Sequence, residues 1–203
     1  MMKSEMCVES VLPKVKAVSS QLETVAQERL FAYKLFSAAF NYPDNTFLSF
    51  FPEENKEKLL VEYDSLFRAS EIWLYTTEYL AENEFQRTNF LSDISGFYRA
   101  FGLQIDKERP DFLATELEFM HFLIFKQMYA LCRNINDSKE KAAICSDAQK
   151  KFFNTYLYPS AKRIAQKVIA RSKAGFYKRK AIEMLGFFES EIKYFGKGPS
   201  PSN

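Results

Sequence analysis

The amino-acid sequence predicts an all-α fold, a single helical domain of roughly eight to ten helices spanning residues 1–203. Apolar residues recur at three- and four-residue spacing along the chain, and no stretch alternates apolar and polar residues as a strand would. Phenylalanine is abundant (21) and glycine scarce (6), which favours packed helices over turn-rich β structure. No internal repeat and no linker rich in Pro, Gly or Ser interrupts the 203 residues, so one domain is expected.

The N-terminal helices are expected to be bounded by prolines and a capping serine. The predicted ranges are 22–40, 47–51, 54–67 and 71–81. The first helix should stop before Pro43, because a residue that precedes proline avoids helical angles. The second should end at Pro52, and Ser70 is placed to cap the fourth. We expect residues 1–19 to be loosely ordered.

The central part of the chain predicts a helix, a short loop and a second helix, over residues 83–101, 104–109 and 110–133. Gly102 follows the first helix directly and can take the left-handed conformation that closes a helix C-terminus, while Leu103 can fold back onto the last turn. Pro110 suits the first turn of the next helix, because its missing N–H has no helical partner there. Asp111 would add negative charge beside the positive end of that helix.

The predicted helix 110–133 is apolar on most sides, which is typical of a central, buried helix. Its core stripe consists of Leu113, Leu117, Met120, Ile124, Met128 and Leu131. Its acidic residues, Asp111, Glu116 and Glu118, fall in the first two turns. Helical geometry places four residues on one face: Asp111, Thr115, Glu118 and Phe122. Glu116 flanks the core stripe.

The C-terminal part predicts three further helices. A polar turn at 134–137 precedes a helix at 138–156, which Ser138 can cap. Pro159 starts a second helix that ends at Arg171, and residues 176–195 form the third. Gly196 ends this helix, and residues 196–203 are expected to be a loosely ordered tail.

Residues 97–120 resemble the signature of the TorD/DmsD/NarJ family of molybdoenzyme maturation chaperones, closest to the TorD/DmsD branch. The family pattern runs Tyr-x-x-Phe-Gly-Leu, a short loop, then Pro-Asp-His-Leu-x-x-Glu-Leu-Glu-Phe-Met. The matching residues are Tyr98, Phe101, Gly102, Leu103, Pro110, Asp111, Leu113, Glu116, Leu117, Glu118, Phe119 and Met120. Phe112 stands at the histidine position of the pattern. A weaker resemblance extends over about 29–191, where Pro159, Phe176 and Tyr177 are retained, and Tyr156 and Ser160 stand where the family often has His and Trp.

The resemblance implies a TorD-like fold and a cytoplasmic, system-specific chaperone, either a monomer or a homodimer. Its partner would be the apo catalytic subunit of a molybdopterin oxidoreductase, bound through a twin-arginine leader or the N-terminus and held during cofactor insertion before export. Such a leader carries two adjacent arginines and an apolar segment. Carboxylates can pair with the guanidinium groups, and an apolar groove can take the apolar segment.

The resemblance and the helix face together suggest six residues that bind the leader or client: Asp111, Phe112, Thr115, Glu116, Glu118 and Phe122. The residues of the family motif with an expected structural role are Tyr98, Phe101, Gly102, Leu103, Pro110, Leu113, Leu117 and Met120. Alternatives remain open for the three acids. Asp111 can serve only to charge a helix start, Glu118 can lie on a solvated face, and Glu116 can pair with an internal arginine such as Arg99.

The residue inventory argues against an enzyme. His121 is the only histidine, and its place beside the core stripe predicts a packed or hydrogen-bonded side chain. There is no CxxC or HExxH metal motif and no Gly-rich phosphate loop, so no cofactor and no metal are expected. Cys7, Cys132 and Cys145 are predicted to be free thiols. No apolar run reaches the roughly 20 residues of a membrane span, and the N-terminus lacks a secretory signal, so the cytoplasm is the default location.

The charge of +2 hides an asymmetry along the chain. Ten Lys and Arg residues and no acid lie between Asp147 and Glu183, so the remainder carries a net charge of −8. An alternative function is therefore a helical nucleic-acid-binding or regulatory protein that uses segment 150–180. The aromatic residues in this segment have core-like helical spacing rather than the arrangement of a stacking platform. A solvated helical surface or a dock for an acidic partner is favoured over nucleic-acid binding.

Overall fold

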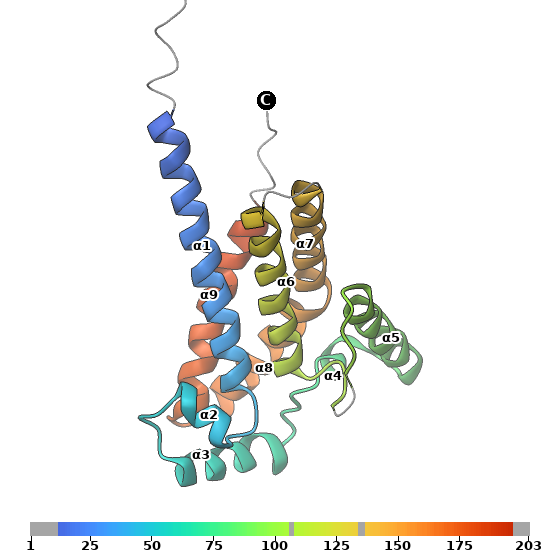
Figure 1. Ribbon diagram of the computed structural model, residues 1–203. Coiled ribbons are helices and arrows are strands. Elements are labelled where there is room, and N and C mark those ends of the chain that lie inside the picture. Colours follow the sequence, from blue (N-terminus) through green and yellow to red (C-terminus); the bar gives the residue numbers. More distant parts are fainter. Residues whose placement is uncertain (1–11, 106–107, 134–136, 197–203) are drawn as a thin grey trace, which may run out of the picture.

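The computed structural model in Figure 1 describes residues 12–105, 108–133 and 137–196. These residues form α-helices joined by short turns, with two π-helical turns labelled η1 and η2. The elements are α1 (Leu12–Ala39), α2 (Asn45–Phe50), α3 (Lys56–Tyr63), η1 (Asp64–Arg68), α4 (Thr77–Leu80), α5 (Glu84–Ala100), α6 (Leu113–Arg133), α7 (Ser138–Phe152), η2 (Phe153–Leu157), α8 (Tyr158–Arg171) and α9 (Phe176–Gly196). No strand occurs in the described ranges, which confirms the all-α prediction.

The chain becomes helical earlier than the sequence predicted. Helix α1 begins at Leu12, so the prediction that residues up to 19 are loosely ordered is wrong for residues 12–19. Pro13 lies in the first turn of α1, where a proline is tolerated because its missing N–H would have no helical partner. Residues 1–11 and 197–203, which were also predicted to be loosely ordered, lie outside the described part of the chain.

The predicted helix 71–81 is wrong over most of its length, since only Thr77–Leu80 is helical. The segment before it pairs instead with the chain that leads into α6: the Leu113 N–H donates to the Leu74 carbonyl at 2.8 Å, and the Thr76 N–H donates to the Asp111 carbonyl at 2.8 Å. These bonds satisfy backbone groups that a helix would have used internally. The Ser70 hydroxyl donates to the Leu66 carbonyl in η1 rather than capping a following helix.

Helix α6 is the central element of the body, with α1 on one side and α7 on the other, while α8 and α9 complete the body and α5 lies at its edge (Figure 1). The buried face of α6 contains Leu113, Leu117, Met120, Leu123 and Ile124, which are all fully buried. This confirms the predicted core stripe as far as Ile124. Leu131 is 56 % exposed, because the last turn of α6 lies at the end of the bundle (Figure 1).

A buried ion pair joins α1 to α9. The Arg29 guanidinium donates to both carboxylate oxygens of Glu191, at 2.6 and 2.8 Å, and the two side chains are 5 % and 1 % exposed. Tyr33 donates its hydroxyl to the same carboxylate at 2.7 Å, and Gln149 of α7 accepts from Arg29 at 3.0 Å. The guanidinium also lies 3.9 Å from the ring centroid of Tyr194. This network therefore fixes three helices relative to one another.

The end of α5 forms the turn that the sequence predicted. Gly102 has a φ of 76°, and its N–H donates to the Arg99 carbonyl at 3.0 Å. The Leu103 N–H donates to the Tyr98 carbonyl at 2.9 Å, and the Leu103 side chain packs against the core. These two bonds define a Schellman motif, which satisfies the last carbonyls of the helix and turns the chain toward α6.

We predict that Glu191→Ala lowers the free energy of unfolding by about 3–5 kcal/mol, because it leaves the Arg29 guanidinium buried without its counter-charge. Replacing both partners, as Arg29→Met with Glu191→Leu, should cost much less, since no uncompensated charge stays buried. Urea denaturation of the single and double variants measures both quantities. If the single and double variants lose the same free energy of unfolding, the buried unpaired charge is not the cause of the loss.

Candidate functional site

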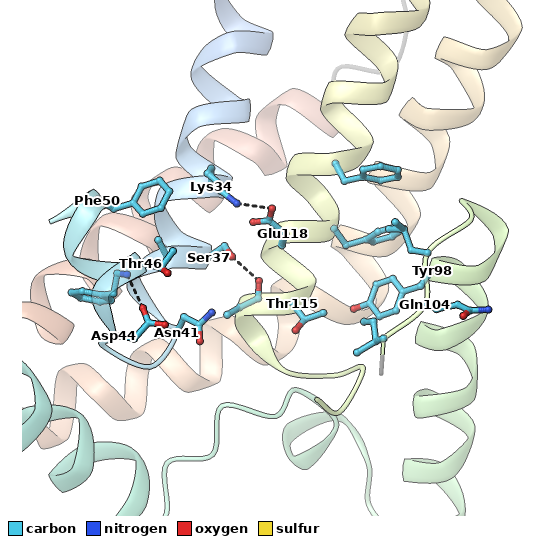
Figure 2. Close-up of a pocket in the computed structure, with 17 residues that line it drawn as sticks. Lys34, Ser37, Asn41, Asp44, Thr46, Phe50, Tyr98, Gln104, Thr115 and Glu118 are labelled. Atoms are coloured by element: carbon cyan, nitrogen blue, oxygen red, sulfur yellow. Dashed lines mark hydrogen bonds and ion pairs between the residues drawn. The ribbon is translucent and has the colours of Figure 1, made fainter. Parts of the chain in front are cut away.

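A cavity of about 580 Å³ lies between α1, α2, the loop after α5 and the first turns of α6 (Figure 2). Phenylalanine and aliphatic side chains form much of its wall: Phe47, Phe50, Leu103, Ile105, Phe119 and Phe122. Its polar side chains come mainly from the facing helices: Lys34, Ser37, Asn41, Asp44, Thr46, Thr115 and Glu118. The cavity is therefore amphipathic, which is the usual character of a binding site for a small molecule or a peptide.

Three of the six predicted contact residues, Thr115, Glu118 and Phe122, line this cavity. Figure 2 shows the Glu118 carboxylate facing Lys34 of α1, with 2.7 Å between Oε1 and Nζ. The two side chains are 42 % and 39 % exposed. An ion pair this exposed contributes about 0–1 kcal/mol, so Lys34 can be replaced by another cation at little cost.

Asp111 lies apart from the cavity and is fully buried. Its carboxylate accepts a hydrogen bond from the Arg109 guanidinium at 2.8 Å and another from the Thr77 N–H at 3.2 Å, and it also binds the Thr77 hydroxyl. Since α6 begins at Leu113, the prediction that Pro110 and Asp111 occupy its first turn is wrong. Asp111 instead caps the N-terminus of α4 through Thr77, and this contact connects α4 to the chain that leads into α6.

Glu116 is also fully buried and points away from the cavity. Its Oε1 accepts from the Thr76 hydroxyl at 2.6 Å, so the alternative in which Glu116 pairs with an arginine such as Arg99 does not hold. Its Oε2 has no hydrogen-bond partner in the described residues. Burial raises the pKa of Glu116 well above its usual range; the Thr76 hydrogen bond opposes this, and the Asp111 charge adds to it.

Phe112 and Tyr98 contact the chain on either side of the two buried acids, Asp111 and Glu116. The backbone of Phe112 forms an isolated antiparallel bridge with Tyr75, and the two ring centroids are 5.8 Å apart. Tyr98 lines the cavity and donates its hydroxyl to the Pro110 carbonyl at 2.7 Å. Its ring packs edge-on against Phe119 at 4.8 Å. The signature residues therefore hold the start of α6 in place beside the cavity.

Sequence reasoning missed the wall of the cavity that α1 and α2 provide. Lys34 and Ser37 lie on one face of α1, Asn41 follows the end of this helix, and the Ser37 hydroxyl donates to the Ala114 carbonyl at 2.9 Å. The three-residue spacing of Lys34 and Ser37 on an otherwise apolar stretch is a signal that could have indicated this face of α1. Asp44 accepts from the Phe47 N–H at 2.9 Å and so begins α2 at the rim.

The histidine and the cysteines outside the cavity form no catalytic or metal-binding group in the described residues. The Nδ1 of His121 lies 2.9 Å from the Leu30 carbonyl, which confirms the prediction of a hydrogen-bonded histidine. Cys132 and Cys145 are free thiols, as predicted, and Cys7 is outside the described ranges. In the part of the chain that the structure describes, no cluster of His, Cys, Asp or Glu could hold a metal ion. None of the helices described is long and apolar enough to cross a membrane.

The basic segment 150–180 is not a uniform positive surface. Arg179 pairs with Glu54 at 2.7 Å and Lys180 with Glu183 at 2.7 Å. Lys178 donates to the carbonyls of Ser172 and Lys173, at 3.0 and 3.3 Å. These three basic residues lie in α9, whereas the basic side chains of α8 lie on the exposed side of a helix whose apolar side is buried. This segment therefore gives no independent support for a nucleic-acid-binding function.

The fold and the cavity define an all-helical binding protein. Residues 34–166, more than half of the chain, match the family described as nitrate reductase delta subunit. The chain belongs to this family, which comprises NarJ/TorD-type molybdoenzyme maturation chaperones.

The chain is also similar to a protein of Dechloromonas aromatica (strain RCB) that is named perchlorate reductase assembly chaperone protein. The two are 32 % identical over 94 residues. This similarity covers 45 % of the chain and 40 % of that protein, so it spans less than half the length of either.

We predict that Glu116→Gln removes a pH-dependent part of the stability. Because the pKa of Glu116 is raised in the folded state, folding retains a proton that the unfolded chain releases above about pH 4.5, and stability falls as pH rises toward the folded pKa. Each pH unit in this window costs up to about 1.4 kcal/mol. Urea denaturation from about pH 5 to pH 8 should show a smaller loss in the variant. If the stability of the variant and of the original protein changes with pH in the same way, Glu116 is not the group responsible.

Proposed function

We propose that this chain holds the apo catalytic subunit of a molybdopterin oxidoreductase in the cytoplasm until its cofactor is inserted and the enzyme is ready for export. It does so by binding the N-terminal leader of that subunit in the cavity between α1, α2 and α6. The observation that carries the proposal is the half-exposed Glu118 carboxylate at the amphipathic cavity, whose ion-pair partner among the described residues is Lys34. An arginine of the leader replaces Lys34 and pairs with this carboxylate bidentately.

Apolar side chains continue from the cavity along the same faces of α1 and α6. Phe31 lies one turn before Lys34 and is 65 % exposed. Phe122 lies one turn after Glu118 and is followed by Phe125 and Tyr129, which are 51 % and 46 % exposed and stack on each other. This track accepts the apolar segment of the leader, as helix-lined grooves accept apolar peptide segments.

The six predicted contact residues take two roles in this proposal. Thr115, Glu118 and Phe122 contact the leader directly, because they line the cavity. Asp111, Phe112 and Glu116 hold the start of α6, and they act on the leader through the position of Glu118. The chain itself carries out no covalent chemistry, and its contribution is to bind and protect the client.

The client is a reductase of the molybdopterin class. Membership of the maturation-chaperone family supports this class. The name of the Dechloromonas aromatica relative, a perchlorate reductase assembly chaperone, supports a reductase as the kind of enzyme that is assembled. Capture of the tagged chain from extract of its source cells, followed by mass spectrometry, should enrich one molybdopterin-type catalytic subunit with its leader uncleaved. Recovery of nucleic acid in its place would overturn the proposal.

We predict that Glu118→Lys weakens binding of a peptide with two adjacent arginines and an apolar segment by at least about tenfold. The change removes the carboxylate and sets a second cation beside Lys34. Fluorescence anisotropy of the labelled peptide gives the affinity. Glu140→Lys on α7 is the matched control, because it makes the same charge change at an exposed glutamate outside the cavity. Normal binding by Glu118→Lys would exclude the cavity as the leader site.

A further inference from the structure

A second surface, separate from the cavity, follows the outer face of α8. Three adjoining hollows lie along this helix and share residues: Lys167 and Ala170 line the first two, and Arg171 lines the second and third. They form one continuous depression from Arg163 to Lys173, which we name the α8 trough. Its opposite wall is formed by residues 69–72 and 78–79, and at its far end by α3 and η1.

One wall of the α8 trough is basic. Arg163, Lys167 and Arg171 follow one another at four-residue spacing on the exposed side of α8, whose opposite side is buried. Arg163 donates to the Tyr79 carbonyl, and the Lys167 ammonium lies 5.4 Å from the Tyr79 ring centroid. These contacts hold the side chains toward the trough but leave their charges without a carboxylate partner in the described residues. Arg171 likewise has no ion pair among them.

The facing wall carries acids, and this limits what can bind. Glu71 and Glu78 line it beside the first two hollows, and Glu57 and Glu62 line the third. Glu78 is neutralised by Arg87 and Arg109, at 3.1 Å from each. A nucleic-acid strand or an anionic membrane would place phosphates against the remaining carboxylates. The only aromatic side chain of the trough, Tyr79, is 8 % exposed in the described structure, so bases would find no stacking surface.

We propose that the α8 trough binds an extended acidic segment of a partner protein, with acidic side chains at alternate positions facing Arg163, Lys167 and Arg171. An extended polypeptide fits between a basic wall and an acidic wall, because its successive side chains point to opposite sides. Its acids can face α8 while neutral or basic residues face Glu71.

The spacing of the basic row matches an extended segment. Residues four apart on a helix rise by about 6 Å. Alternate residues of an extended chain repeat at about 6.6 Å. Three acids at positions i, i+2 and i+4 therefore meet the three basic residues in register, whereas three contiguous acids would direct the middle one at the acidic wall. This surface is independent of the leader-binding cavity and engages a different part of the client or another protein.

The test titrates the ¹⁵N-labelled full chain, at low ionic strength, with a short peptide that has glutamate at alternate positions and serine between them. Amide chemical shifts locate the site and give the affinity. The comparison probes are a peptide of the same composition with contiguous glutamates, a thymidine oligonucleotide and phosphatidylglycerol vesicles. Lys167→Gln with Arg171→Gln is the trough variant. Lys139→Gln with Lys150→Gln is the matched control, since it removes the same charge from exposed positions on α7.

We expect the alternating peptide to shift the amides of α8 and to bind roughly five- to tenfold more weakly to the trough variant. The control variant should change the affinity by no more than about twofold. If the alternating and contiguous peptides bind with equal affinity, the proposed register is wrong. If the trough variant and the control variant lose the same affinity, the binding depends only on net charge and the proposal is wrong. Tighter binding of the oligonucleotide or the vesicles, or no binding of the alternating peptide, would also refute the proposal.

Discussion

The position of α6 depends on two buried carboxyl groups, those of Asp111 and Glu116, which bind the residues at the start of α4. Asp111 joins Arg109 and Thr77, and Glu116 binds Thr76. A buried polar group is costly unless it is hydrogen-bonded, so these residues strongly favour one placement of residues 76–77 against α6. In the second turn of this helix, Glu118 reaches the cavity. Asp111 and Glu116 thus determine where Glu118 lies. The shape of the cavity therefore depends on hydrogen bonds that lie outside it.

Most helices could be predicted because their limits are local. Gly102 ends α5 with a positive φ, and the apolar face of α6 repeats at helical spacing. The segment 71–81 could not be predicted, because its backbone bonds to residues 111 and 113. The local helix or strand propensity of this segment carries no information about a hydrogen-bond partner more than thirty residues away. The early start of α1 was missed for a different reason, because a weak apolar pattern near Pro13 does not exclude a helix.

The candidate site was predictable on the helix that carries the signature and unpredictable elsewhere. Helical geometry correctly placed Thr115, Glu118 and Phe122 on one face, and these three residues line the cavity. The same geometry grouped Asp111 with them, but the chain has not yet become helical there, and the side chain turns inward to Arg109. That the six residues bind a client stays a prediction. The spacing of Lys34 and Ser37 indicates a polar face of α1, but only the tertiary packing shows that this face lies opposite α6.

The burial of Asp111 and Glu116 has a consequence for how such proteins can be adapted. The residues by which the family is recognised serve largely as scaffold, whereas the wall of the cavity also contains groups from α1 and α2, outside the signature. Recognising the signature therefore identifies the type of chaperone and leaves its cargo open. A laboratory selection for a new cargo can randomise Lys34, Asn41 and Thr46 and keep residues 97–120 intact. Apart from side chains such as Thr115 and Glu118, the scaffold and the polar wall of the cavity therefore lie in different segments of the chain.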